Sequence, residues 1–180
     1  MLNRIGQHTI SLPNRPRILS GASIAGKKEG AGPLHDDFDQ IIADDLFGEE
    51  TWEKAESRFQ YTAADLAIRK AGLTHGQIDA ALGGDLLDQI MAASLAVREL
   101  HTPFIGLYGA CSTMAESLLL ASLLTESGMA NRCLAATSSH FCSAERQFRF
   151  PLEYGGVRTP SAQWTVTGAG ACVTALQSGA

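Results

Sequence analysis

The stretch Phe104-Ile-Gly-Leu-Tyr-Gly-Ala-Cys-Ser-Thr-Met-Ala-Glu-Ser-Leu-Leu-Leu120 predicts a short buried strand that turns sharply into a helix. Gly109-Ala110 places no bulky side chain next to Cys111 in the turn. Thr113 and Glu116 have the spacing of a capping box, which marks a helix start. The positive end of a helix dipole favours the thiolate of a cysteine placed there. Cys111 is therefore either a reactive thiol or an inert buried side chain.

The helix predicted over residues 112–127 is apolar around most of its circumference. Its apolar side chains are Met114, Ala115, Leu118, Leu119, Leu120, Ala121, Leu123 and Leu124. A helix of this kind is enclosed by other elements, so we expect a buried central helix. The apolar run at residues 118–124 is too short to cross a bilayer, and no direct membrane insertion is expected.

Length and charge restrict the class of protein. The chain has 180 residues, which suits one domain with a sizeable core. Its formal net charge is -5, and no basic run is long enough to follow a phosphate backbone, so nucleic-acid binding is not expected. The cysteines have neither a Cys-x-x-Cys pair nor a zinc-site spacing, which indicates a reducing compartment. The first ten residues lack the apolar core of a signal peptide, so we expect a protein that is not secreted.

Two patterns that would indicate a cofactor or a metal are incomplete. The glycine-rich loop at residues 26–32 lacks the spacing and the terminal Lys-Ser/Thr of a phosphate loop. Asp36, Asp37 and Asp39 are clustered, but they do not complete the spacing of a calcium loop. We therefore expect no cofactor and no protein-held metal.

Strands and helices alternate along the chain. The pattern predicts helices at residues 36–47, 57–71, 86–100 and 112–127, strands at 17–25, 80–84, 104–108 and 132–138, and a closing strand pair or bent strand at 163–166 and 169–176. This order is typical of the α/β class, with a mixed, mostly parallel sheet and helices on both faces.

Three short motifs together resemble the N-terminal half of the thiolase fold, the superfamily of thiolases and β-ketoacyl synthases. Residues 109–112, Gly-Ala-Cys-Ser, open an apolar helix as the nucleophilic cysteine turn of that superfamily does. Residues 71–80 resemble its helix end ahead of the second strand, and residues 167–172 its glycine- and alanine-rich closing strand. The resemblance implies one thiolase-like N-terminal domain over residues 1–180, without the second half of the fold, and a homodimer. In the superfamily, that second half supplies the groups that activate the cysteine.

A longer segment resembles one family within that superfamily. Residues 137–155, Thr-Ser-Ser-His-Phe-Cys-Ser-Ala-Glu-Arg-Gln-Phe-Arg-Phe-Pro-Leu-Glu-Tyr-Gly, are similar to the stage V sporulation protein AD family, and so are residues 19–35. The resemblance implies a non-catalytic thiolase-fold protein that binds dipicolinic acid (pyridine-2,6-dicarboxylate) and supports its uptake into the developing spore. The implied partners are dipicolinic acid, free or as its calcium chelate, and other proteins of the stage V sporulation A operon. The implied location is the cytoplasm or the periphery of the spore inner membrane.

Binding a planar dianion requires fixed cationic donors, and arginine suits this role best. Arg146, Arg149 and Arg158 supply guanidinium groups among aromatic residues whose ring faces can stack on a ligand. The alternative is an ordinary loop in which these arginines pair with Glu145 and Glu153. With the family resemblance, we favour a ligand role and select Arg146 and Arg149.

Ser138 and His140 lie at the end of the strand predicted over residues 132–138, where open α/β sheets place their ligands. A histidine there can donate a hydrogen bond to a carboxylate or contact Cys111, although a lone histidine is more often structural. We expect Cys111, Ser138 and His140 to line the ligand site together with the two arginines. The alternative function is acyl transfer with Cys111 as the nucleophile, which also requires a base and an oxyanion hole.

Overall fold

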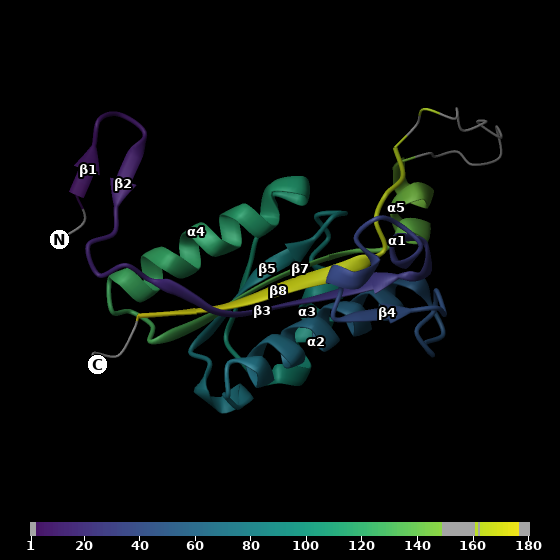
Figure 1. The fold of residues 1–180 in the computed structure, drawn as a ribbon, viewed down its shortest axis with the longest axis horizontal. Helices are drawn as coiled ribbons and strands as arrows, with labels where there is room; N and C mark the ends of the chain where they lie inside the picture. Colours follow the sequence, from purple (N-terminus) through teal and green to yellow (C-terminus); the bar gives the residue numbers. More distant parts are fainter. Residues whose placement is uncertain (1–2, 149–160, 162, 177–180) are drawn as a thin grey trace.

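A six-stranded sheet forms the centre of the protein (Figure 1). The structure, a computed structural model, describes residues 3–148, 161 and 163–176. The strands lie in the order β4 (Gln40–Ile42), β3 (Arg17–Gly26), β8 (Gly168–Ala175), β7 (Arg132–Ser139), β5 (Ala80–Asp85) and β6 (Phe104–Gly106). A separate antiparallel hairpin of β1 (Asn3–Ile5) and β2 (Thr9–Ser11) projects from one end of the molecule.

The sheet is mixed, as predicted. β3 and β4 are parallel, and so are the pairs that β5 makes with β6 and with β7. β8 is antiparallel to both of its neighbours, β3 and β7. The last strand of the described chain therefore joins two parallel groups in the middle of the sheet.

Helices cover both faces of the sheet, which confirms the prediction (Figure 1). The helices are α1 (Lys27–Gly30), α2 (Trp52–Lys70), α3 (Met91–Leu100), α4 (Thr113–Glu126) and α5 (Phe141–Phe148). α2 and α3 lie on one face and α4 on the other. Because successive strand residues point to opposite faces, Leu134 and Ala136 of β7 pack on the α2 side, around Phe59, while Cys133 packs on the α4 side.

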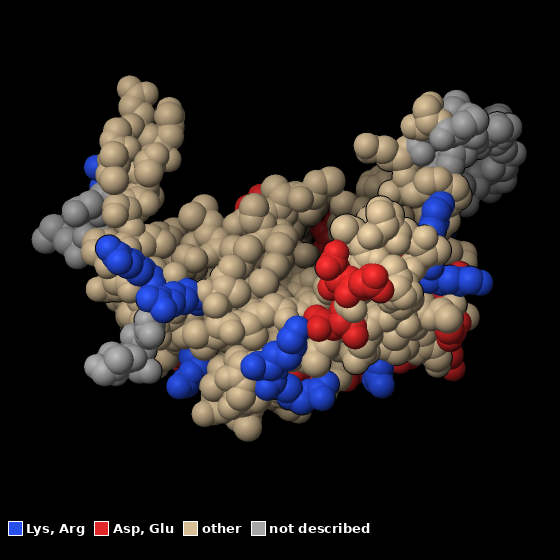
Figure 2. All heavy atoms as spheres, in the orientation of Figure 1, with Lys and Arg blue, Asp and Glu red and all other residues tan. Residues whose placement is uncertain are grey.

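α4 is not enclosed, contrary to the prediction. It packs on the sheet along a stripe of small and hydroxyl side chains at four-residue spacing, which are Thr113, Ser117, Ala121 and Thr125, all buried. Small side chains let the helix axis approach the strands, so its leucines lie to the side and outside, and Leu119 is 57% exposed. Figure 2 shows few charged side chains on the surface around α4. Even so, no helix in the described part of the chain is long and apolar enough to span a membrane.

Two local predictions are wrong. The helix predicted over residues 36–47 is a short 3-10 turn, His35–Asp37, followed by the strand β4. Pairing with β3 gives this segment the hydrogen bonds that a helix would otherwise have provided. Residues 163–166 are not a strand, and β8 begins at Gly168.

Gly83 in β5 allows an unusually close approach of two strand backbones. A Cβ atom at this position would lie 1.9 Å from the carbonyl oxygen of Ala136 in β7. We expect Gly83→Ala to push β5 away from β7 and to lower the free energy of unfolding by about 1–3 kcal/mol. Urea denaturation followed by circular dichroism measures this change. Gly170→Ala in β8 is the control, because a Cβ there meets nothing within 4 Å, and equal stabilities of the two variants would refute the expectation.

Candidate functional site

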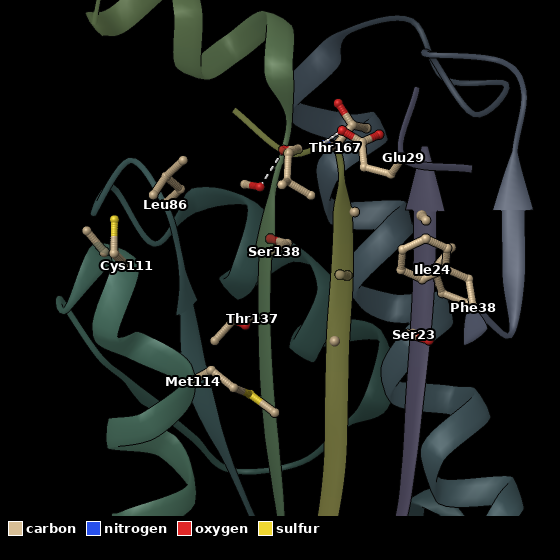
Figure 3. Close-up of a pocket in the computed structure, with 17 residues that line it drawn as sticks. Ser23, Ile24, Glu29, Phe38, Leu86, Cys111, Met114, Thr137, Ser138 and Thr167 are labelled. Carbon is tan, nitrogen blue, oxygen red and sulfur yellow. Dashed lines mark hydrogen bonds between the residues drawn. The ribbon is translucent and has the colours of Figure 1, made fainter. Parts of the chain in front are cut away.

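A groove of about 300 Å³ opens at the carboxyl ends of β5 and β7 (Figure 3). Ser23 and Phe38 form one wall, and Cys111 and Met114, at the start of α4, form the other. Thr137 of β7 lies between the two walls. Open α/β sheets bind their ligands at this location.

Cys111 lies in the groove wall with an exposed side chain, in the 3-10 turn Ala110–Ser112 directly before α4. The predicted position at a helix start is therefore confirmed. Ala110 has a left-handed φ of 47°. Its N–H donates a 2.8 Å hydrogen bond to Oδ1 of Asp88, which holds the turn in this conformation.

The predicted capping box is not formed. Ser112 precedes the first helical residue, and its hydroxyl lies 2.9 Å from the Gly109 carbonyl oxygen and also contacts the Glu116 carboxylate. Within the described chain, Oγ1 of Thr113 is buried without a hydrogen-bond partner. The charged side chains bonded to the cysteine turn are Asp88 and Glu116, both acidic.

Ser138 borders the groove, but its hydroxyl belongs to a buried network on the α2 side of the sheet. Its Oγ lies 3.0 Å from Oε1 of Glu56 and 3.1 Å from Oε1 of Gln60. The Gln60 amide nitrogen in turn donates a 3.1 Å hydrogen bond to the Ala136 carbonyl oxygen. Of the predicted site residues that lie in the described part of the chain, Ser138 and Cys111 are the two that the structure brings to the groove.

His140 lies outside the groove and is 1% exposed. Its Nε2 donates a 2.7 Å hydrogen bond to the Asp45 carbonyl oxygen, and its Nδ1 accepts one of 3.2 Å from the Cys142 N–H. These two partners define the neutral tautomer with the proton on Nε2. His140 therefore fixes the start of α5 in the structure, and its ligand role stays a prediction.

Arg146 also lies away from the groove. Its guanidinium pairs with Glu53 of α2 and lies 5.7 Å from the centre of the Trp52 ring. The pairing with a glutamate agrees in kind with the alternative interpretation, and the described partner is Glu53. Arg149 and Arg158 lie outside the described residues, so the role chosen for Arg149 stays a prediction.

Glu56 is a buried residue that the sequence reading did not identify. It is 3% exposed, and its Oε2 lies 3.3 Å from Oγ of Ser143 in α5. Burial, together with the charge of Asp85, raises the pKa of Glu56 to about 7. The available signal was that Glu56 and Gln60 continue the buried helix face formed by Ala63 and Ala67, where polar residues are rare.

Asp85, the last residue of β5, is the second buried carboxyl group at these strand ends. It is 3% exposed, and its Oδ1 accepts a 3.2 Å hydrogen bond from the Gln89 N–H. Its Oδ2 is buried and has no hydrogen-bond partner within the described residues. Such an oxygen costs free energy, because burial removes its water without a replacement.

Glu56→Gln tests whether the Glu56 carboxyl is neutral. Its pKa is about 7 in the folded protein and 4.5 ordinarily, so the folded state keeps a proton that the unfolded chain releases. The free energy of unfolding should therefore fall by about 3 kcal/mol between pH 4.5 and 7 in the wild type, and this component should vanish in Glu56→Gln. Urea denaturation across this range measures it, with the exposed Glu99→Gln as control. Parallel profiles of wild type and Glu56→Gln would contradict a neutral carboxyl.

Comparison with known sequences finds a matching family model and a curated relative. The family model for Stage V sporulation protein AD matches residues 6–180. The chain is 44% identical over 162 residues to stage V sporulation protein AD of Bacillus subtilis (strain 168), covering 90% of this chain and 48% of that protein. It therefore spans about half the length of this curated relative.

Solved structures share the fold. The 3-oxoacyl-[acyl-carrier-protein] synthase III from Aquifex aeolicus VF5 matches with a TM-score of 0.61 and 20% identity, over 89% of this chain and 54% of that one. Xanthomonas campestris OleA H285N with cerulenin matches with a TM-score of 0.61 and 17% identity, over 89% and 57%. At this identity the likeness shows the fold alone, which confirms the thiolase-like architecture. The chain belongs to the stage V sporulation protein AD family.

Proposed function

We propose that this protein binds dipicolinic acid at the carboxyl ends of its central strands and thereby supports uptake of the acid into the developing spore. The observation that carries the proposal is the groove of about 300 Å³ between β3 and the start of α4, in a member of this sporulation family. Its volume suits a ligand with one aromatic ring and two carboxylates. The other proteins of the same sporulation operon would be its partners, at the periphery of the spore inner membrane or in the cytoplasm.

The side chains of the groove offer both kinds of contact that this ligand needs. Phe38 and Met114 supply apolar surface for a ring, and the hydroxyls of Ser23 and Thr137 supply hydrogen-bond donors. Among the described lining residues, Glu29 is the charged one. Its Oε1 accepts a 3.1 Å hydrogen bond from the Thr167 N–H, and its Oε2 is buried without a partner in the described chain.

A carboxylate in the groove favours the calcium chelate of dipicolinic acid over the free dianion. The metal ion of the chelate offsets the ligand's negative charge and presents a hard cation to oxygen atoms such as those of Glu29. A free dianion would instead need the guanidinium of Arg149. We also propose a homodimer, and the exposed Ile105 on the edge strand β6 offers a surface for it.

Acyl transfer by Cys111 is the second candidate function. The exposed thiol at a helix start, beside the groove, favours it. Against it, no histidine borders the groove among the described residues, and the nearby His140 is committed to Asp45 and Cys142. The groove therefore supports ligand binding without turnover better than it supports acyl transfer.

Filling the groove should weaken binding. A larger side chain at Gly170 finds open space and enters the groove that this residue lines, so Gly170→Leu should weaken dipicolinate binding about ten- to a hundredfold. Isothermal titration calorimetry, with and without calcium, measures the affinity. Gly170→Ala is the matched control and should bind nearly as the wild type does. Unchanged affinity in Gly170→Leu would place the ligand elsewhere.

Variants of two arginines test which arginine binds the ligand and which has a structural role. Arg149→Ala should weaken binding of free dipicolinate about ten- to a hundredfold, because a charged hydrogen bond is lost. Arg146→Ala should leave the affinity nearly unchanged, because Arg146 is paired with Glu53. The same calorimetric titration, after circular dichroism has shown that both variants fold, makes the comparison. Equal affinities in the two variants would remove Arg149 from the site.

A further inference from the structure

Glu56 and Asp85 lie on the opposite side of the sheet from the groove, at the same strand ends. Asp85 is paired directly with Ser138 across β5 and β7. The Ser138 hydroxyl points to α2, where it meets Glu56, while its neighbour Thr137 faces the groove. One layer of strands therefore separates the buried carboxyl pair from the ligand site.

The hydrogen-bond network around Glu56 contains acceptors for a proton on its carboxyl group. Gln60 donates through its amide nitrogen to Ala136, so its Oε1 is an acceptor. The single hydroxyl proton of Ser138 goes to Glu56 Oε1 while that carboxyl is ionised, and it can go to Gln60 Oε1 once the carboxyl is protonated. The Ser143 hydroxyl likewise donates to the His140 carbonyl oxygen at 3.1 Å. Both hydroxyl oxygens that face Glu56 then present lone pairs, and one of them can accept a proton from a neutral carboxyl.

Asp85 is connected to the cysteine turn through the loop at residues 86–90. The Gln89 N–H donates to the Asp85 carboxylate, and the Leu86 N–H donates a 3.1 Å hydrogen bond to the Ser138 carbonyl oxygen. Asp88, with a left-handed φ of 57°, accepts the N–H of Ala110, the residue before Cys111. A displacement of Asp85 therefore reaches both Leu86 and the cysteine turn, which line the groove.

We propose that the proton on Glu56 regulates ligand binding in the groove, because it lets Asp85 hold the loop at residues 86–90 and the Cys111 turn in place. Without the proton, two carboxylates are buried together at the strand ends. This regulation rests on the proposed dipicolinate function, but the movement of the loop does not depend on it.

The described groups that face Glu56 would not neutralise a negative charge on Glu56 in addition to that of Asp85. On its own helix, Glu53 adds negative charge and is itself paired with Arg146 of α5. β5 brings Asp85, β7 brings the neutral Ser138, and α5 brings the neutral Ser143. His140, before α5, uses Nε2 as a donor to Asp45 and Nδ1 as an acceptor. Among the residues that the structure describes, no nearby group therefore offsets the repulsion between Glu56 and Asp85.

Asp85 is the partner that can respond to this repulsion. Glu56 is fixed in α2 between Ala55 and Ser57, both buried, whereas Asp85 ends a strand and continues into a loop. Turning Asp85 toward water releases the Gln89 N–H and shifts Leu86. Since the pKa of Glu56 is about 7, the change falls between pH 6 and pH 8.

The test compares wild type, Glu56→Gln and the control Glu99→Gln at pH 6 and pH 8. Calorimetric titration with calcium and dipicolinate should show that wild-type affinity falls about fivefold or more at pH 8, whereas Glu56→Gln keeps its pH 6 affinity. Ligand carboxylates are ionised at both values. Iodoacetamide labelling of Cys111, read by peptide mass spectrometry, should show a wild-type to Glu56→Gln rate ratio that rises from pH 6 to pH 8.

The outcomes separate the two proposals. If no variant binds dipicolinate at either pH, the proposed function is wrong, and the labelling ratio alone decides whether the loop moves. Identical pH profiles of wild type and Glu56→Gln in both measurements would overturn the regulation. If Glu56→Gln does not fold, Asp85→Asn replaces it, because removing the other charge should abolish the same pH dependence.

Discussion

The antiparallel insertion of β8 between β3 and β7 is the interaction on which the rest of the structure depends. It places Thr167, the residue before β8, next to three other elements of the fold. The Thr167 carbonyl oxygen accepts a 2.8 Å hydrogen bond from the Gly26 N–H, its N–H donates to Glu29, and its hydroxyl accepts the Phe141 N–H. One residue thus joins the end of β3, α1 and the start of α5, and Thr167 and Glu29 themselves line the groove.

The parts of the fold that depend on nearby residues were predictable. Gly109 and the apolar residues on either side determine the strand, the turn and the helix around Cys111 within a short segment. The position of β4 was not predictable, because residues 40–42 form a strand only through pairing with the distant β3. The prediction that α4 is enclosed was wrong for a related reason. Its many leucines make the helix sequence hydrophobic, but the small side chains of Ser117 and Ala121 approach the sheet closely and determine which side of the helix is buried.

The candidate site was predictable in location but not in its buried chemistry. A cysteine at a strand-to-helix turn indicates the carboxyl edge of a sheet, and the groove is there. Glu56 and Ser138, by contrast, are 82 positions apart in the chain, and a helix pattern does not reveal which strand residue a buried carboxyl will meet. The polar positions 56 and 60 on an otherwise apolar face were the remaining sign of the network.

A carboxyl group at position 56 is harder to explain by stability than by function. A glutamine there would offer a donor and an acceptor to Ser138 and Ser143 without the cost of burying a charge beside Asp85. Glu56 offers both a donor and an acceptor, as glutamine would, only while its carboxyl group is protonated. A side chain whose ionisation near neutral pH destabilises the folded protein is expected at a site where function requires the proton to be released. Asp85 acts on Glu56 through its charge, and hydrogen bonds made by the loop at residues 86–90 connect Asp85 to Ala110, the residue before Cys111, so loss of the proton acts on the groove and not only on the core.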